Sequence, residues 1–313
     1  MRIIGVFILV MSLMLLFGCE KDMETIISPN IHNVIAVSNQ NIYAVTNSKR
    51  VIVTGDNSFS QHSASEWEDI VGIAANEISV VGLKEDGSLV FLGEDYGAKR
   101  WKNMQRLDLG HTHIVGLNVD NELVASGILS RFHFESGDTR VKGDASKDYV
   151  NNWTDVQDFS VGYGHTVAVS SEGETMFFGY NLDGQGNLED FTEITMVKAA
   201  YFHTLGLNQN KSVVHAGSDY HQLGDMTDFN DIIFIEATER GSIGVKSDGS
   251  IVTVGPNLRG ELELSDWENV IAVYGCSYFT VGLKDDGTIL FAGTDKERNL
   301  NTEIFTDIVT IFD

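Results

Sequence analysis

The segment Val-Gly-Leu-Lys-Asp-Asp-Gly-Thr-Ile-Leu-Phe-Ala-Gly at residues 281–293 predicts a β-hairpin, because two apolar runs flank an Asp-Gly pair. Tight hairpin turns need a positive φ, which glycine adopts without steric cost and aspartate tolerates. Residues 81–93 repeat the pattern as Val-Gly-Leu-Lys-Glu-Asp-Gly-Ser-Leu-Val-Phe-Leu-Gly. The chain therefore contains the same hairpin more than once.

Two markers show that this hairpin belongs to an internal repeat. Glycines expected to close the hairpins, the last four each 38 residues apart, are Gly55, Gly93, Gly127, Gly179, Gly217, Gly255 and Gly293. Aromatic residues expected to open an apolar strand are Trp67, Trp101, Trp153, Phe191, Phe229, Trp267 and Phe305. From aromatic to closing glycine the distance is 26 residues in all six complete copies. The first copy, from Ile31 to Gly55, lacks the aromatic, as an atypical terminal repeat does.

Each repeat is expected to hold three antiparallel strands, with a fourth left open. A unit of about 38 residues cannot bury both faces of such a sheet alone, so it must stack on its neighbours. Radial stacking leaves short, protected strand edges, and the 3.6-residue periodicity of a helical repeat is absent. The sequence therefore predicts an all-β protein in which residues 31–313 form a single seven-bladed β-propeller.

Residues 159–187 resemble a repeat of the regulator of chromosome condensation (RCC1-like) family. The resemblance rests on the Gly-x-x-His-Thr step at Gly162 to Thr166, the Glu172-Gly173 turn and the Gly-Gln-Gly tail at Gly184 to Gly186. Weaker echoes are His221-Gln222-Leu223-Gly224 and Phe202-His203-Thr204. The resemblance implies a seven-bladed propeller that serves as a binding platform. It names no partner, because this fold carries many functions.

The two ends of the repeat array predict how the ring closes. The opening strand occurs eight times, near residues 31, 67, 101, 153, 191, 229, 267 and 305, but there are only seven hairpins. We expect Phe305 to Phe312 to pair with the first blade or to lie across the seam. Such pairing would remove the open edge between the first and last blades.

The N-terminus resembles a bacterial lipoprotein signal peptide over residues 1–18. Arg2 precedes an apolar run from Ile3 to Phe17, and Leu16-Phe17-Gly18-Cys19 matches a lipobox. Fifteen apolar residues are short for a membrane span and suit a signal core. Cleavage before Cys19 would give a diacylated N-terminus joined to the propeller by a tether, residues 19–30, and two acyl chains anchor stably. An ordinary signal peptide or a short anchor is the alternative.

Charge limits the partners of the exported protein. Removing residues 1–18 leaves 20 Lys and Arg against 45 Asp and Glu, a net charge of −25. A surface this acidic repels phosphate backbones, so nucleic acid is excluded as a partner. A cationic protein or a cation-rich surface remains open.

One connection departs from the repeat. Residues 128–152 exceed the usual 12-residue spacing by 14. The insertion carries cationic and aromatic residues, the types that dominate interface energetics. Those predicted to bind a partner are Arg131, Phe132, His133, Phe134, Arg140 and Tyr149. The alternative is a tolerated surface excursion, because loops accept extra length at little cost.

Histidines and the second cysteine do not predict a metal or cofactor site. His113, His165 and His203 share one repeat phase and fall on successive blades, and only His111 and His113 approach zinc-ligand spacing. Structural histidines between blades are favoured, and no metal or other cofactor is assigned. Cys276 falls at the phase of a small residue, which predicts a buried structural thiol.

Two functions remain. The first is a non-catalytic, monomeric, membrane-anchored lipoprotein of the bacterial cell envelope that binds a protein or a surface glycan. The second is an envelope carbohydrate-active hydrolase or lyase with its site on the propeller face. No linear catalytic motif occurs, so no catalytic residue is assigned. The first function predicts an aromatic patch on one rim, and the second a deep pocket with convergent carboxylates and a histidine.

Overall fold

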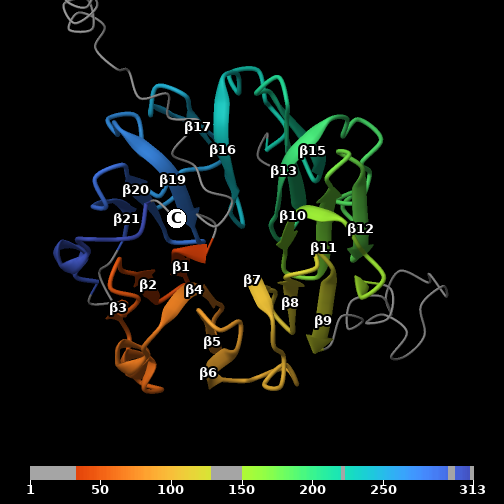
Figure 1. The fold of residues 1–313 in the computed structure, drawn as a ribbon. Helices are drawn as coiled ribbons and strands as arrows, with labels where there is room; N and C mark the ends of the chain where they lie inside the picture. Colours follow the sequence, from red (N-terminus) through yellow and green to blue (C-terminus); the bar gives the residue numbers. More distant parts are fainter. Residues whose placement is uncertain (1–32, 128–149, 220–222, 295–299, 311–313) are drawn as a thin grey trace, which may run out of the picture.

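Seven three-stranded antiparallel sheets make up the part of the chain that the computed structural model describes, residues 33–127, 150–219, 223–294 and 300–310. Each sheet is one blade, and the blades surround a central channel (Figure 1). The first strand of each blade lies nearest the channel and the third lies outermost. The predicted seven-bladed propeller is confirmed, with three strands in each blade.

The strands follow the chain in order, three to a blade. Blades 1 to 4 contain β1 (Ile35–Val37), β2 (Asn41–Val45), β3 (Val51–Gly55), β4 (Ile70–Ala75), β5 (Ser79–Lys84), β6 (Leu89–Gly93), β7 (Met104–Leu109), β8 (His113–Asn118), β9 (Leu123–Gly127), β10 (Val156–Val161), β11 (His165–Ser170) and β12 (Thr175–Gly179). Blades 5 to 7 contain β13 (Ile194–Ala199), β14 (His203–Asn208), β15 (Val213–Gly217), β16 (Ile232–Ala237), β17 (Ser242–Lys246), β18 (Ile251–Val254), β19 (Val270–Gly275), β20 (Phe279–Lys284) and β21 (Ile289–Gly293). The connections include the 3-10 helices η3 (Gln61–Glu66) and η5 (Thr302–Ile304).

The antiparallel order gives the propeller two different faces. The loops that join the first and second strands of every blade lie at one end, which we call the mouth face. The tight turns that join the second and third strands lie at the other end, the turn face. The closing glycines belong to the mouth face: Gly293 has a φ of 120°, and a Cβ there would lie 2.5 Å from the carbonyl oxygen of Tyr278.

The aromatic marker packs over a glycine in the middle of the second strand. A Cβ at Gly282 would lie 2.5 Å from the ring of Trp267, and one at Gly82 would lie 2.8 Å from the ring of Trp67. Trp267 does not open the inner strand as predicted, because β19 begins three residues later at Val270. The aromatic ring therefore fills the space that a side chain at the glycine would occupy, so the aromatic residue and the glycine occur together in the repeat.

The C-terminal segment closes the ring by completing blade 1. Ile308 pairs with Thr46 of blade 1, and the amide of Val309 donates to the carbonyl of Val45 at 3.1 Å. The amide of Ile308 also donates to the carbonyl of Gly287 in blade 7, at 3.1 Å. The predicted pairing across the seam is confirmed, and the eighth opening strand is the missing part of the first blade.

The seam falls at a β-bulge that recurs in the other six blades. In each of those blades the inner strand shifts register after its first residue, as between Val270 and Ala272 in blade 7. In blade 1 the residue before the shift is Ile308, from the C-terminal segment, and the residues after it begin with Ile35. The residue after Ile308, Val309, donates its amide to the carbonyl of Val45, and the amide of Val45 donates to the carbonyl of Val34. The chain is therefore interrupted at the irregular point of the ladder, and both sides of the interruption still bond to β2.

Buried histidines connect blades 3 to 6, as the sequence predicts. In each pair the imidazole Nε2 lies 3.1–3.3 Å from a hydroxyl of the next blade: His113 with Thr166, His165 with Thr204, and His203 with Ser242. All three rings are buried. Burial lowers the pKa of His113 to about 4 and those of His165 and His203 to about 3. The histidines are therefore neutral structural links between blades.

Deleting residues 305–313 should lower the melting temperature by about 10 °C or more. The deletion exposes the buried side chains of Phe305, Ile308 and Val309 and frees the edge of blade 1. Burial of each such side chain contributes about 1.5–3 kcal/mol, and in domains of this size each kcal/mol shifts the melting temperature by about 2–4 °C. Differential scanning calorimetry measures the change. A melting temperature equal to that of the intact chain would contradict the seam.

Acidification from pH 6.5 to pH 5 should destabilise the protein through these histidines. Their native pKa values lie below the unfolded value of about 6.5, so in this window the unfolded chain binds more protons and the free energy of unfolding falls as the pH falls. The variant His165→Gln should lose less stability than the wild type between these two pH values, by up to about 1.4 kcal/mol per pH unit. Urea unfolding at both values tests this, and equal slopes would show that His165 does not contribute.

Candidate functional site

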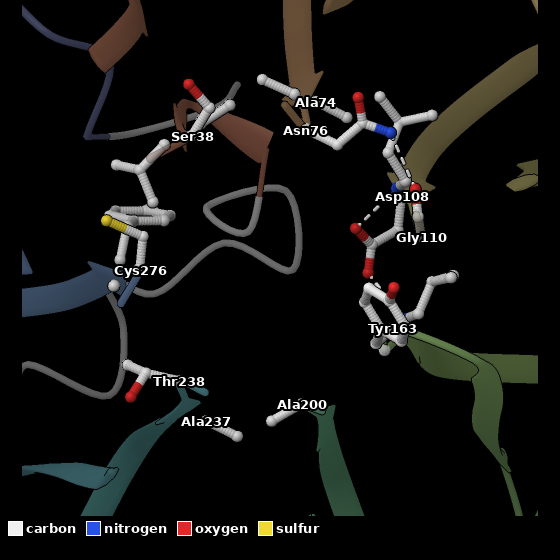
Figure 2. A pocket seen from close by; sticks show the side chains of 18 of the residues that line it. Ser38, Ala74, Asn76, Asp108, Gly110, Tyr163, Ala200, Ala237, Thr238 and Cys276 are labelled. Atoms are coloured by element: carbon white, nitrogen blue, oxygen red, sulfur yellow. Dashed lines mark hydrogen bonds between the residues drawn. The ribbon is translucent and has the colours of Figure 1, made fainter. Parts of the chain in front are cut away.

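One residue from each blade surrounds the channel at the mouth face. These seven residues lie two positions after the end of the inner strand, and we call them the mouth ring: Asn39, Glu77, His111, Tyr163, Tyr201, Glu239 and Ser277. They line a cavity of about 210 Å³ together with the last residues of the inner strands. Figure 2 shows Asp108 and Tyr163 on one wall of this cavity, with Thr238 and Cys276 across from them.

Members of the mouth ring contact one another across blade boundaries. The ring of Tyr163 stacks between those of His111 and Tyr201, with centroid distances of 4.6 and 4.5 Å. Glu77 accepts a hydrogen bond from Asn39 at 3.3 Å, and its other carboxylate oxygen lies 3.7 Å from His111 Nδ1. The result is a wall of three aromatic rings with a carboxylate at its blade 2 end.

A second carboxylate, Glu239 of blade 6, stands at the other end of this wall. It accepts a hydrogen bond from the Ser277 hydroxyl and lies 3.3 Å from the Nε of Arg240. Burial raises the pKa of Tyr201, and the charges of Glu77 and Glu239 raise it further. Both carboxylates therefore act on one phenol hydroxyl, although they come from blades on different sides of the channel.

Charged side chains continue below the mouth ring. Lys198 Nζ lies 2.8 Å from a carboxylate oxygen of Glu236, and both side chains are largely buried. Asp108 accepts hydrogen bonds from the amides of Val161 and Leu109, each at 2.8 Å. Burial raises the pKa values of Asp108 and Glu236, and the nearby Lys198 ammonium opposes the rise. The channel therefore holds two carboxyl groups close to one ammonium.

A buried ion pair joins the inner strands of blades 3 and 4. Arg106 pairs with Asp158, and both side chains are buried. The guanidinium also donates to the carbonyl of Phe159 at 2.6 Å, and Asp158 accepts from the amide of Val197 at 2.7 Å. Because every partner is a protein group, this pair joins blades 3, 4 and 5 and supports the channel wall.

A groove between blades 1 and 2 opens beside the mouth ring. Its cavity of about 650 Å³ shares four lining residues with the channel cavity: Ser38, Asn39, Asn76 and Glu77. The groove also has an apolar side, formed by Ile78 and Leu92, with Phe59 at its rim. The two cavities therefore form one depression that runs from the channel across the mouth face.

Exposed apolar side chains gather on the mouth face. Seven large apolar residues are exposed in the described part of the chain, and five of them lie in loops of this face: Phe59, Ile78, Leu182, Phe202 and Leu258. The ring of Phe202 lies 5.9 Å from that of Tyr201, so it extends the aromatic wall outward. Apolar groups gathered beside a polar cavity are typical of interaction sites.

The residues predicted from the sequence meet different outcomes. Cys19 and the insertion residues Arg131, Phe132, His133, Phe134, Arg140 and Tyr149 lie outside the described residues. β9, the strand before the insertion, ends at the mouth face, because a Cβ on Gly127 would lie 2.5 Å from the carbonyl oxygen of Thr112, the neighbour of His111. Cys276 is half-buried in the channel wall, so its predicted full burial is wrong.

Sequence reasoning missed the mouth ring, apart from His111. Its members occupy the same position in each repeat but differ in residue type. A comparison of the repeats that looks for similar residues therefore does not find them. A usable signal lies three residues earlier, where Asp108, Lys198 and Glu236 place charges in apolar inner strands. No group of three or more metal-ligating side chains occurs among the residues that the structure describes.

Comparisons with known proteins agree with the fold. No family model and no curated protein sequence matches the chain. Among solved structures, the CRINKLY WD40 ectodomain of the Arabidopsis thaliana receptor kinase ACR4 is similar with a TM-score of 0.65 and 16% identity, covering 85% of this chain and 98% of that one. Prp20p from Saccharomyces cerevisiae is similar with a TM-score of 0.57 and 16% identity, covering 86% and 83%. Yeast RCC1 (Prp20) bound to Kap60 gives 0.59 and 14%, covering 87% and 86%. The chain therefore has an RCC1-like seven-bladed β-propeller fold.

Proposed function

We propose that this protein is a non-catalytic binding scaffold of a bacterial cell envelope, tethered to a membrane by lipid on Cys19, whose mouth face binds another protein. The observation that carries the proposal is the depression on the mouth face, with the exposed Phe59 and Ile78 in its groove and the exposed Phe202 beside Tyr201. Burying such side chains against a partner contributes favourable free energy, and the adjoining polar groups provide specificity.

The turn face is less suited to binding a partner than the mouth face. The aspartates of its tight turns bind within their own turns: Asp86 accepts from the amide of Ser88, Asp248 from Ser250, and Asp286 from Thr288, each at 2.9 Å. Hydrogen bonds from the hydroxyls of Ser88, Ser250 and Thr288, together with these amide hydrogen bonds, lower the pKa values of all three carboxyl groups. A face of ionised, solvated turns resists burial against a partner.

The tether fits this orientation. The described chain begins at Asn33 and Val34, directly before β1, and β1 runs from the turn-face end of the channel toward Asn39 in the mouth ring. A lipid on Cys19 would thus be joined to the propeller at the turn-face end, by a segment that spans at most roughly 50 Å. The mouth face would then point away from the membrane. No helix of the described residues is long and apolar enough to cross a membrane.

The similar structures favour a protein as the partner. The yeast RCC1 (Prp20) structure is a complex with Kap60, and Prp20p binds Gsp1p and histones. At 14–16% identity this likeness extends to the fold alone, and the partner of this chain is proposed from its own mouth face.

A carbohydrate-active hydrolase or lyase is the second candidate, because Glu77, Glu239 and His111 converge on the cavity as a catalytic site would require. The engagement of these groups disfavours it: Glu239 is held by Ser277 and Arg240, and Glu77 by Asn39. Release of reducing sugar from cell-envelope polysaccharide by the wild type, and its loss in Glu77→Gln, would establish the enzyme in place of the scaffold.

Replacing Phe59 and Ile78 by serine should abolish capture of the partner. Both side chains are exposed, by 85% and 56%, so the double variant should fold normally. Immobilised residues 20–313 are incubated with an envelope extract, and bound proteins are quantified by mass spectrometry. The matched control is Val119→Ser, which alters an apolar residue of the turn face that is 59% exposed. Partners lost with the double variant and retained with the control support the proposal, and equal recovery by both contradicts it.

A variant lacking residues 130–150 tests the insertion in the same experiment. Because Gly127 places the start of the insertion at the mouth face, its removal should reduce recovery of the same partner. Recovery equal to that of the wild type would show that the insertion is a tolerated excursion.

Replacing Cys19 by serine should move the protein from the membrane fraction to the soluble fraction. The substitution removes the acceptor of the proposed acyl chains, and without them nothing else in the proposal holds the propeller at the membrane. Metabolic labelling with a fatty acid analogue and cell fractionation measure the change. Labelled Cys19→Ser protein in the membrane fraction would show that the anchor lies elsewhere.

A further inference from the structure

We propose that the mouth ring receives a positively charged side chain, lysine or arginine, from an extended segment of the partner that lies in the groove between blades 1 and 2. This inference rests on the proposed function and names the chemistry of the bound segment. It follows from the charge of the depression, its hydrogen-bonding groups and its shape.

The depression carries more negative than positive groups. Among the residues that the structure describes, its two cavities are lined by five carboxyl groups, Glu77, Glu94, Asp108, Glu236 and Glu239, and by one cationic side chain, Lys198. Just outside, Arg240 pairs with Glu239, and the guanidinium of Arg259 lies 4.4 Å from the Tyr278 ring. Lys198 is already held by Glu236 at 2.8 Å. Glu77, Glu94 and Asp108 therefore face the depression, and no lysine or arginine of the described part of the chain lies within ion-pair distance of them.

The mouth ring offers acceptors at the point where this charge is concentrated. Both Glu77 and Glu239 line the channel cavity. Each carboxylate oxygen has two lone pairs, so the hydrogen bonds that Glu77 accepts from Asn39, and that Glu239 accepts from Ser277 and Arg240, leave acceptor capacity for a further donor. An ammonium or a guanidinium supplies only donors and one positive charge. It fits this site, whereas a phosphate or a carboxylate would be repelled.

The aromatic wall offers a surface for the stem of a long side chain. His111, Tyr163 and Tyr201 are stacked with interplanar angles of 26° and 23°, so the wall is a fixed surface beside the carboxylates. The tilted Phe202 extends it outward. The aliphatic stems of lysine and arginine pack on such apolar surfaces while their charged heads stay with polar partners.

The shape of the depression selects an extended segment. The channel cavity of about 210 Å³ accommodates one side chain. The adjoining groove of about 650 Å³ accommodates several residues of extended chain and presents Phe59, Ile78 and Leu92 to apolar side chains. The bound segment therefore has a basic residue with apolar residues close to it in sequence.

Binding of short labelled peptides to residues 20–313 tests the inference by fluorescence anisotropy. The probe is a peptide of alternating serine and leucine with one central lysine, and the comparison peptides carry arginine, norleucine or glutamate there. The lysine and arginine peptides should bind at least tenfold more tightly than the norleucine and glutamate peptides. Equal affinity for the lysine and norleucine peptides would overturn the inference, because norleucine keeps the shape of lysine without its charge.

Two carboxylate variants locate the site. Glu77→Gln and Glu239→Gln should each weaken binding of the lysine peptide at least tenfold. The matched control is Asp248→Asn, which removes the same charge from the exposed turn face. A loss equal in all three variants would show general attraction to an acidic protein and would overturn the site.

The capture experiment separates this inference from the proposed function. If Glu77→Gln and Glu239→Gln retain a partner that the Phe59→Ser and Ile78→Ser double variant loses, the mouth face binds a protein and the cation site is wrong. If the double variant also retains every partner, the proposed function itself fails. If the double variant and both glutamine variants lose the same partner, both hold.

Discussion

Closure of the blade ring is the constraint on which the rest of the structure depends. Ile308 pairs with Thr46, and its amide donates a hydrogen bond to the carbonyl of Gly287. These two contacts join the last blade to the first. The channel exists only because the inner strands are held in a closed circle, and the mouth ring draws one residue from each blade of that circle. Glu77 and Glu239 come from blades 2 and 6, so their convergence on one cavity requires the ring to be complete.

The sequence predicted the fold well because the stacking contacts recur at fixed spacing. The contact of Trp267 with Gly282 and the contact of His165 with Thr204 each recur in other blades. Their residues therefore appear in the sequence at a regular spacing. The place of the aromatic before the strand was not predictable, because a tryptophan that ends a connection and one that begins a strand look alike in sequence. The strand starts only after Asn269, whose φ of 59° interrupts the extended backbone.

The candidate site was largely hidden for the opposite reason. Glu77, Tyr163, Tyr201 and Glu239 differ in type from copy to copy, and differences between copies carry no periodic signal. They are tens of residues apart in sequence, and only the closed ring brings them together. The positions of the repeat thus fall into two groups. Residues that contact the next blade are of similar type in the different copies, whereas residues in the loops at the channel entrance differ in type. Chemistry specific to this chain accumulates in the second group.

The β-bulge at the seam has a consequence for the origin and connectivity of the molecule. Blade 1 shows that an inner strand of this propeller tolerates a chain break at its bulge, with Ile308 on one side and Ile35 on the other. Each of the other six blades has a bulge at the same place. No blade is therefore the required starting point, and a circularly permuted gene could open the ring at any of these bulges. The same equivalence allows such a ring to arise by tandem duplication of one blade-sized unit, whichever part of the blade the ancestral fragment began with.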